Sequence, residues 1–287
     1  MALREASAGK DINRREPTGM CILHVAASAN WLEGVDELIR LKAYIDVPDK
    51  KYATALHKAV LLPNAQAMVQ KLCAAGADLN LQDLNPEYDP EFSSTTYRDI
   101  NPEIHRTPLH YSSEKGDVDT MRILTEHQAD VNIQDGEMKT PLHLAIQEDH
   151  RTAIDLLLQS RADVHLSSLQ SGMKNSPLMD AAHCNNHWLA ERLIEARANV
   201  NQQGKSDMAA IHLAARRGDP KMVQILLSAR ADIEQESACG TALKLAKQKG
   251  GEELLQVLGV TTPQPSTGPV SSVATLTAEQ RAALFMD

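Results

Sequence analysis

A four-residue phrase recurs along the chain at nearly constant intervals. The letters TALH, TPLH and TPLH stand at 54–57, 107–110 and 140–143, and looser versions stand at 21–24, 176–179, 209–212 and 241–244. The last positions of successive phrases lie 33, 53, 33, 36, 33 and 32 residues apart. An apolar pair such as Leu226-Leu227 and a phrase similar to Ala-Asp-Val-Asn (129–132) follow these tetrads. A period of about 33 residues indicates a stack of like units.

Each unit carries the signals of two short helices. Thr favours the N-cap of a helix and Pro its first turn, so each tetrad predicts a helix start. The apolar spacing in segments such as 222–227 predicts a second helix with a wide buried stripe. The pattern resembles the ankyrin repeat family over residues 18–258. We therefore expect an all-α fold, an ankyrin-repeat solenoid of about seven stacked helix-turn-helix units with loop or β-hairpin fingers.

Two sets of positions need a backbone with positive φ. The turn between the two helices of a unit offers Asn30, Gly116, Asp149, Asn185 and Gly218, all residues that tolerate this region. The end of the second helix, where the family usually has Gly, offers Lys42, Gly76, Gln128, Arg161, Arg197 and Arg230. A residue other than Gly costs on the order of 1 kcal/mol there. We expect the basic side chains to recover part of this cost at the helix C-terminus.

Three segments depart from the repeat. Residues 1–17 resemble the end of a repeat whose helices are mostly missing, and they predict a partial N-terminal repeat or cap. Residues 84–106 form an irregular insertion, whose prolines exclude a regular helix. Residues 259–287 have the composition of a Pro/Ser/Thr-rich linker and end in a predicted short helix near 277–286.

Composition excludes several classes of protein. The formal net charge of −9 argues against binding nucleic acid without regard to sequence. No run of about 18 apolar residues is present, so we expect no membrane insertion. The four cysteines are far apart and form no CxxC pair, which favours reduced thiols in a cytoplasmic or nuclear protein.

The histidines do not indicate catalysis. Those of the tetrads lie about 33 residues apart, in successive layers, so we expect them to join neighbouring units by hydrogen bonds. His183, Cys184 and His187 have a spacing that could suit zinc, but a turn is predicted between them and further ligands are missing. Nucleotide-binding, metalloprotease and hydrolase motifs are absent from the sequence. We expect no enzyme activity, no cofactor and no metal.

With catalytic and metal-binding motifs absent from the sequence, the exposed surface is the part of the protein expected to carry its function. The family resemblance implies that partners bind to the fingers and to the concave side of the first helices. The expected partner-binding residues are Leu61, Leu62, Tyr88, Phe92, Tyr97, Glu114, Lys115, Gln147, Glu148, His183, Arg216, Arg217 and Lys247. This surface changes from apolar through mixed charge to basic, which suits an acidic segment of a partner; ordinary solvated charge is the alternative. The three aromatic residues belong to the insertion, which either binds a partner or packs on the array.

The sequence thus predicts a monomeric, non-enzymatic scaffold or adaptor that binds a partner protein through its concave face and finger loops. The alternative is the substrate-recognition portion of a larger signalling or ubiquitin-ligase assembly, whose activity lies on another chain or segment.

Overall fold

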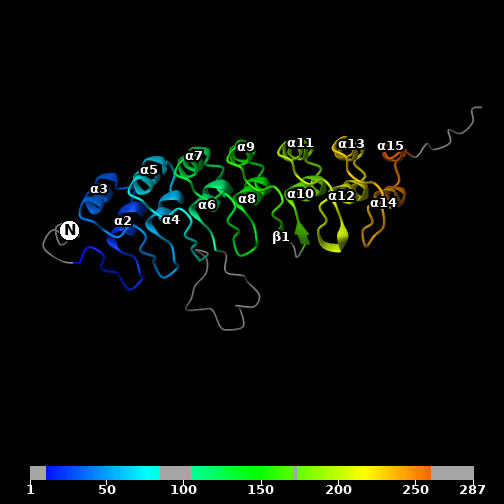
Figure 1. Ribbon diagram of the computed structural model, residues 1–287. Helices are drawn as coiled ribbons and strands as arrows, with labels where there is room; N and C mark the ends of the chain where they lie inside the picture. The colour runs from blue at the N-terminus through cyan, green and yellow to red at the C-terminus, as the bar shows by residue number, and fades with distance from the viewer. Residues whose placement is uncertain (1–10, 85–104, 171–172, 260–287) are drawn as a thin grey trace, which may run out of the picture.

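The computed structural model describes residues 11–84, 105–170 and 173–259, in which helices pair and stack in chain order (Figure 1). The inner helices are α2 (Ile22–Ser28), α4 (Ala55–Val60), α6 (Pro108–Lys115), α8 (Pro141–Gln147), α10 (Pro177–His183), α12 (Ala210–Arg217) and α14 (Ala242–Lys249). The outer helices are α3 (Leu32–Arg40), α5 (Gln66–Ala74), α7 (Val118–Glu126), α9 (Arg151–Gln159), α11 (His187–Glu195), α13 (Pro220–Ser228) and α15 (Glu252–Val257). The predicted all-α stack of about seven units is confirmed.

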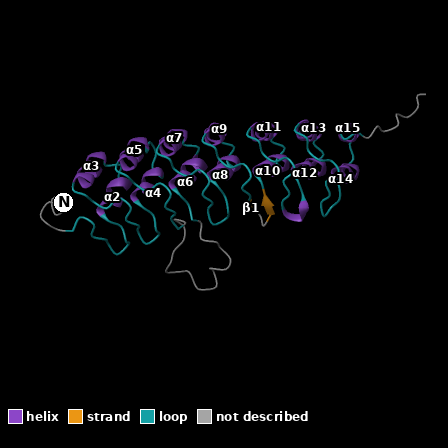
Figure 2. Ribbon diagram, viewed as in Figure 1, coloured by secondary structure: helices purple, strands orange, loops and turns teal. Residues whose placement is uncertain are grey.

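The fingers project from the edge formed by the inner helices, and most of them are loops (Figure 2). The finger before α10 is the exception, because strands β1 (Ser168–Gln170) and β2 (Met173–Asn175) pair antiparallel in it. A short 3-10 helix, η1 (Lys205–Asp207), lies in the next finger. Among the described residues, no helix is long and apolar enough to cross a membrane.

The tetrads start the inner helices as the sequence predicts. Thr107 is the N-cap of α6, and its backbone N–H donates to Nδ1 of His110 over 3.2 Å. Because Nδ1 accepts this bond, the imidazole proton is on Nε2, which donates to the carbonyl of Lys139 in the next finger at 3.1 Å. One histidine therefore both caps its own helix and holds the neighbouring unit.

The other tetrad histidines repeat this contact, with one exception. Nε2 of His24, His57 and His212 bonds to the carbonyls of Ala53, Arg106 and Gln235, at 3.0, 3.1 and 2.8 Å. The predicted role of these histidines is confirmed at four of the five units. Nε2 of His143 is buried and makes no hydrogen bond of normal geometry to the described residues, although the backbone of Leu166 lies close to it.

A second series of bonds runs between the fingers. In most units, the last residue of the phrase similar to Ala-Asp-Val-Asn accepts a hydrogen bond through its side chain. The donor is the backbone N–H of the second residue of the same phrase in the next unit. These bonds join Asn13 to Tyr44, Asp46 to Asp78, Asn80 to Asp130, Asn132 to Asp163 and Asn201 to Asp232, at 2.7–3.0 Å. The equivalent position in the fourth unit is His165, for which the described part of the chain shows no such bond to Asn199.

The two predicted sets of positive-φ positions are confirmed throughout. Among the inter-helix turns, Asn30 has a φ of 51° and Gly116 one of 67°. At the ends of the outer helices, Arg161 has a φ of 63° and Arg230 one of 66°. The side chains of both arginines are exposed and make no hydrogen bond to another described residue, so any benefit from their charge within the described ranges comes from the helix C-terminus.

Candidate partner-binding surface

The expected binding positions lie at the C-terminal ends of the inner helices. Leu61, Glu114, Gln147, His183 and Arg216 each lie four residues after the last position of their tetrad, and Leu62, Lys115, Glu148 and Arg217 follow them. Because the units stack in register, these positions form one row along the inner helices (Figure 1). Leu62, Glu114 and His183 are half-buried and the others are exposed. The aromatic residues Tyr88, Phe92 and Tyr97 lie outside the described residues, as do residues 1–10 and the predicted C-terminal helix.

The first part of the row is apolar. Leu61 is 39% exposed, and the neighbouring inner helix presents Val25, which is 47% exposed. Lys115 reaches this part, where Nζ donates to the carbonyls of Val60 and Leu61 at 3.1 and 2.6 Å. Burial lowers the pKa of Lys115. Its ammonium therefore satisfies the C-terminal carbonyls of α4, a structural role that the sequence did not indicate.

The middle of the row is polar and internally bonded. Glu114 forms an ion pair with Arg106 at 2.7 Å. Gln147 accepts from Nζ of Lys139 at 3.0 Å. These side chains are held by finger residues, so part of the surface is ordered before any partner arrives.

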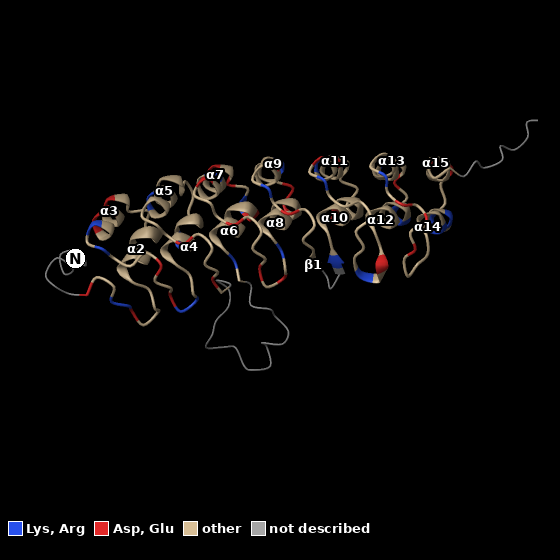
Figure 3. Ribbon diagram, viewed as in Figure 1, with Lys and Arg blue, Asp and Glu red and all other residues tan. Residues whose placement is uncertain are grey.

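The last part of the row is basic (Figure 3). Nε2 of His183 lies 3.0 Å from a guanidinium nitrogen of Arg217. Burial, and then the charges of Arg217 and Arg216, lower the pKa of His183. The imidazole is therefore neutral near pH 7 and accepts from Arg217, leaving the arginine charge uncompensated.

The last inner helix extends this charge. Helix α14 starts after Thr241 as α12 starts after Ala209, which places Gln248 and Lys249 in register with Arg216 and Arg217. Lys247, expected from the sequence, lies one residue earlier and is exposed. We call Arg216, Arg217, Lys247 and Lys249 the basic cluster. Within the described ranges, none of the four forms an ion pair with a carboxylate.

Lys249 is the residue that the sequence reasoning missed. Its side chain lies beside Gly218, where a Cβ would come within 3.0 Å of Cγ of Lys249. The tetrad at 241–244 contains the signal, because counting on from it gives the same register as the tetrad at 209–212.

The two histidines considered for zinc have separate partners. Nε2 of His187 lies 2.6 Å from Oδ2 of Asp219, whereas His183 faces Arg217. Cys184 lies between them in sequence and is exposed. In the part of the chain that the structure describes, no group of three or more His, Cys, Asp or Glu side chains could hold a metal ion.

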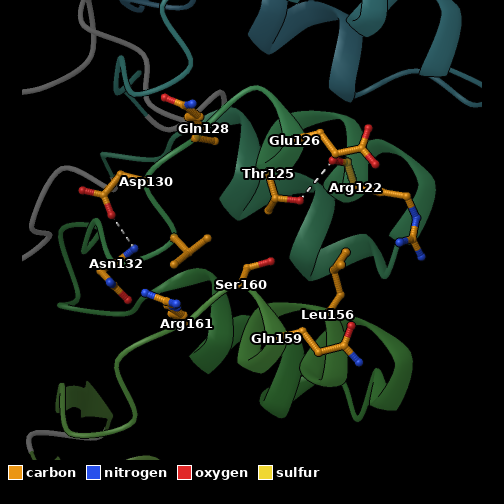
Figure 4. A pocket seen from close by; sticks show the side chains of 12 residues that line it. Arg122, Thr125, Glu126, Gln128, Asp130, Asn132, Leu156, Gln159, Ser160 and Arg161 are labelled. Carbon is orange, nitrogen blue, oxygen red and sulfur yellow. Dashed lines mark hydrogen bonds between the residues drawn. The ribbon is translucent and has the colours of Figure 1, made fainter.

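Two open cavities of about 640 Å³ each lie away from this row. One lies between the C-terminal ends of α7 and α9, and its lining includes Arg122, Glu126, Gln159 and Arg161 (Figure 4). The other lies among the fingers and is lined by residues including Gln134, His165, Lys174 and Gln202.

Comparison with known proteins identifies the repeat. The family described as "Ankyrin repeats (3 copies)" matches residues 2–83, 92–168 and 171–261. Human Rabankyrin-5 is 32% identical over 160 residues, which are 53% of this chain and 13% of that protein. The mouse B-cell lymphoma 3 protein homolog is 28% identical over 229 residues, which are 76% of this chain and 46% of that protein.

A solved structure supports the same fold. The ankyrin repeat domain of Bcl-3 superimposes with a TM-score of 0.67 at 23% identity, covering 84% of this chain and 99% of that domain. The chain spans less than half the length of the two full-length relatives named above. The ankyrin repeat is a non-catalytic module that mediates protein–protein interaction, and this chain belongs to the ankyrin repeat family.

Proposed function

We propose that the protein is a non-enzymatic scaffold or adaptor that binds an acidic segment of a partner protein along the inner helices and fingers of residues 18–258. The observation that carries this proposal is the basic cluster, four cations that have no carboxylate partner among the described residues, in a protein of net charge −9. Arginine guanidinium groups form forked hydrogen bonds with carboxylates, and two such groups stand side by side in Arg216 and Arg217.

The stacked framework supports this role. The histidine and finger bonds hold each unit against the next, so the surface is formed before binding and little ordering entropy is lost. We propose that the protein acts in the cytoplasm or nucleus. We also propose that it is a monomer, because a row of different side chains suits a different protein as partner, whereas a homodimer needs one self-complementary patch.

We expect Arg216→Glu with Arg217→Glu to weaken binding of a fluorescein-labelled Asp/Glu-rich decapeptide about tenfold, because two exposed ion pairs become repulsions. Fluorescence anisotropy at low salt measures the change, and added salt should weaken binding by the native protein as well. The thermal midpoint should barely change, since both side chains are exposed.

The matched control is Lys221→Glu with Arg230→Glu, which makes the same change in net charge on the outer side of the same unit. This control should bind the peptide much as the native protein does. An equal loss in both double variants would show that net charge alone attracts the peptide, and the basic cluster would not be a docking site.

A second role is favoured by the coverage of the relatives. The matched regions make up 13% and 46% of two longer proteins, so in those proteins the array is one part of a larger chain. We propose as the alternative that this array recognises substrates for a larger signalling or ubiquitin-ligase assembly. Loss of a co-purifying catalytic activity in the Arg216→Glu/Arg217→Glu variant would favour this alternative.

A further inference from the structure

One junction of the stack differs from all the others that the structure describes. At most other junctions the inner helix of one unit packs closely on the next, as α6 does on α8 and α10 on α12, while α4 packs less closely on α6. Between the fourth and fifth units, α8 and α10 pack only sparsely, and so do α9 and α11. Figure 1 shows α9 and α11 farther apart than the other neighbours in the outer row.

The two series of bonds between units are interrupted at this same junction. Among the described residues, Nε2 of His143 is the one tetrad Nε2 without a hydrogen bond of normal geometry, although the backbone of Leu166 in the next finger lies close to it. His165 replaces the Asn or Asp that bonds forward elsewhere, and the described residues show no bond from it to Asn199. The finger also lies within the one 36-residue interval of the sequence, between positions 143 and 179, and it contains β1 and β2.

The strands of this finger are attached to different sides of the junction. The N–H of Leu169 in β1 donates to the carbonyl of Glu137 in the preceding finger at 3.0 Å. In β2, Nδ2 of Asn175 donates to Asp180 of α10 at 3.0 Å. The finger is therefore bonded to both sides of the junction, and Gln202 of the next finger also donates to the carbonyl of His165 at 2.8 Å.

Polar side chains also join the two units here. Arg192 of α11 donates to Oδ1 of Asp155 on α9 from Nε at 2.9 Å and from a terminal nitrogen at 2.6 Å. The guanidinium of Arg151 lies 5.0 Å from the ring centroid of Trp188. These groups are on the surface, and exposed polar pairs tolerate changes in separation that interlocked side chains do not.

We propose that the junction between α8–α9 and α10–α11 is a hinge that divides the array into two bodies, an N-terminal block (α2–α9) and a C-terminal block (α10–α15). In a solenoid each unit contacts only its neighbours, so one weak interface separates everything on its two sides. The basic cluster belongs to the C-terminal block and Leu61 to the N-terminal block. Bending would change the distance between the basic and apolar parts of the row. The inference does not depend on the proposed function.

Spin labels at equivalent sites of the outer helices test the hinge. Arg122 in α7, Glu191 in α11 and Gln256 in α15 are exposed and occupy the same helical position, two units apart. Cysteine pairs are introduced at 122/191 and at 191/256 in a Cys184→Ser, Cys239→Ser background, which removes the exposed thiols. We expect the distance distribution for 122/191 to be about twice as broad as that for 191/256, because only the first pair spans the hinge. Equal widths would overturn the proposal.

A matched pair of variants adds a second measurement. Asp155→Ala removes the Arg192 contact at the hinge, and Asp36→Ala removes the equivalent 2.6 Å contact with Lys71 between α3 and α5, at a closely packed junction. Asp155→Ala should broaden the 122/191 distribution further and leave 191/256 unchanged. Asp36→Ala should change neither. If Asp155→Ala had no more effect than Asp36→Ala, the polar contacts would not hold a hinge and the proposal would fail.

Discussion

Replacing His110 with alanine should lower the free energy of unfolding by about 4 kcal/mol, through a buried cavity and two backbone groups left without partners. His110 is fully buried, and burial lowers its pKa to about 4, so the residue is neutral at pH 7. Its removal frees the N–H of Thr107 and the carbonyl of Lys139 together. Chemical denaturation followed by circular dichroism at pH 7 measures the loss.

His143→Ala is the matched control for this result. His143 is also buried and accepts from Thr140 at 3.1 Å, but its Nε2 makes no hydrogen bond of normal geometry to the described residues of the next finger. Its removal should cost about 2 kcal/mol, because no carbonyl of a neighbouring unit loses a bond. Equal losses of unfolding free energy in the two variants would show that the bond between units does not contribute to stability. The histidines would then act only as helix caps and as packed core side chains.

The second large effect concerns Asp83, at the base of the insertion. Its carboxylate is 3% exposed and accepts from the hydroxyl of Tyr111, which lies 3.0 Å from both carboxylate oxygens. Burial raises the pKa of Asp83 to about 7, partly opposed by the Tyr111 bond and by the charge of Lys58, while the charge of Asp49 raises it. The guanidinium of Arg106 lies 5.6 Å from the Tyr111 ring centroid.

The raised pKa of Asp83 makes the stability of the fold depend on pH. The folded-state pKa is above the ordinary value of 3.8, so the protonated carboxyl stabilises the fold below that value. This stabilisation is lost as the pH rises through about 7. Asp83→Asn cannot ionise, so its free energy of unfolding relative to the native protein should rise by about 4 kcal/mol between pH 4 and pH 8.

Tyr111→Phe should have the opposite slope. It keeps the carboxyl but removes the hydroxyl that favours the ionised form, so the pKa of Asp83 should rise further. This variant should become less stable relative to the native protein as the pH increases. Parallel pH profiles for all three proteins would show that Asp83 ionises normally in the fold.

Much of the fold could be predicted because each unit carries its own local signals. Thr107 and Pro108 mark a helix start whatever surrounds them, and Asn30 or Gly116 marks a turn by its tolerance of positive φ. The role of His110 followed from the period, since equivalent residues 33 apart can meet only the neighbouring unit.

The rest depended on contacts between units, which no local pattern encodes. The sequence showed the 36-residue interval, but not that it leaves α8 and α10 sparsely packed. Lys115 looked like a free surface cation, yet the curvature of the stack brings it to the carbonyls of Val60 and Leu61.

Cross-linking mass spectrometry of the protein bound to its captured partner tests the central claim most directly, because lysines occur on both sides of the stack. Lys247 and Lys249 lie on the last inner helix, and Lys221 and Lys71 lie on outer helices. The proposed binding mode predicts that links to the partner come from Lys247 and Lys249 and are lost in the Arg216→Glu/Arg217→Glu variant. Links centred on Lys221 and Lys71, unchanged by that variant, would contradict it.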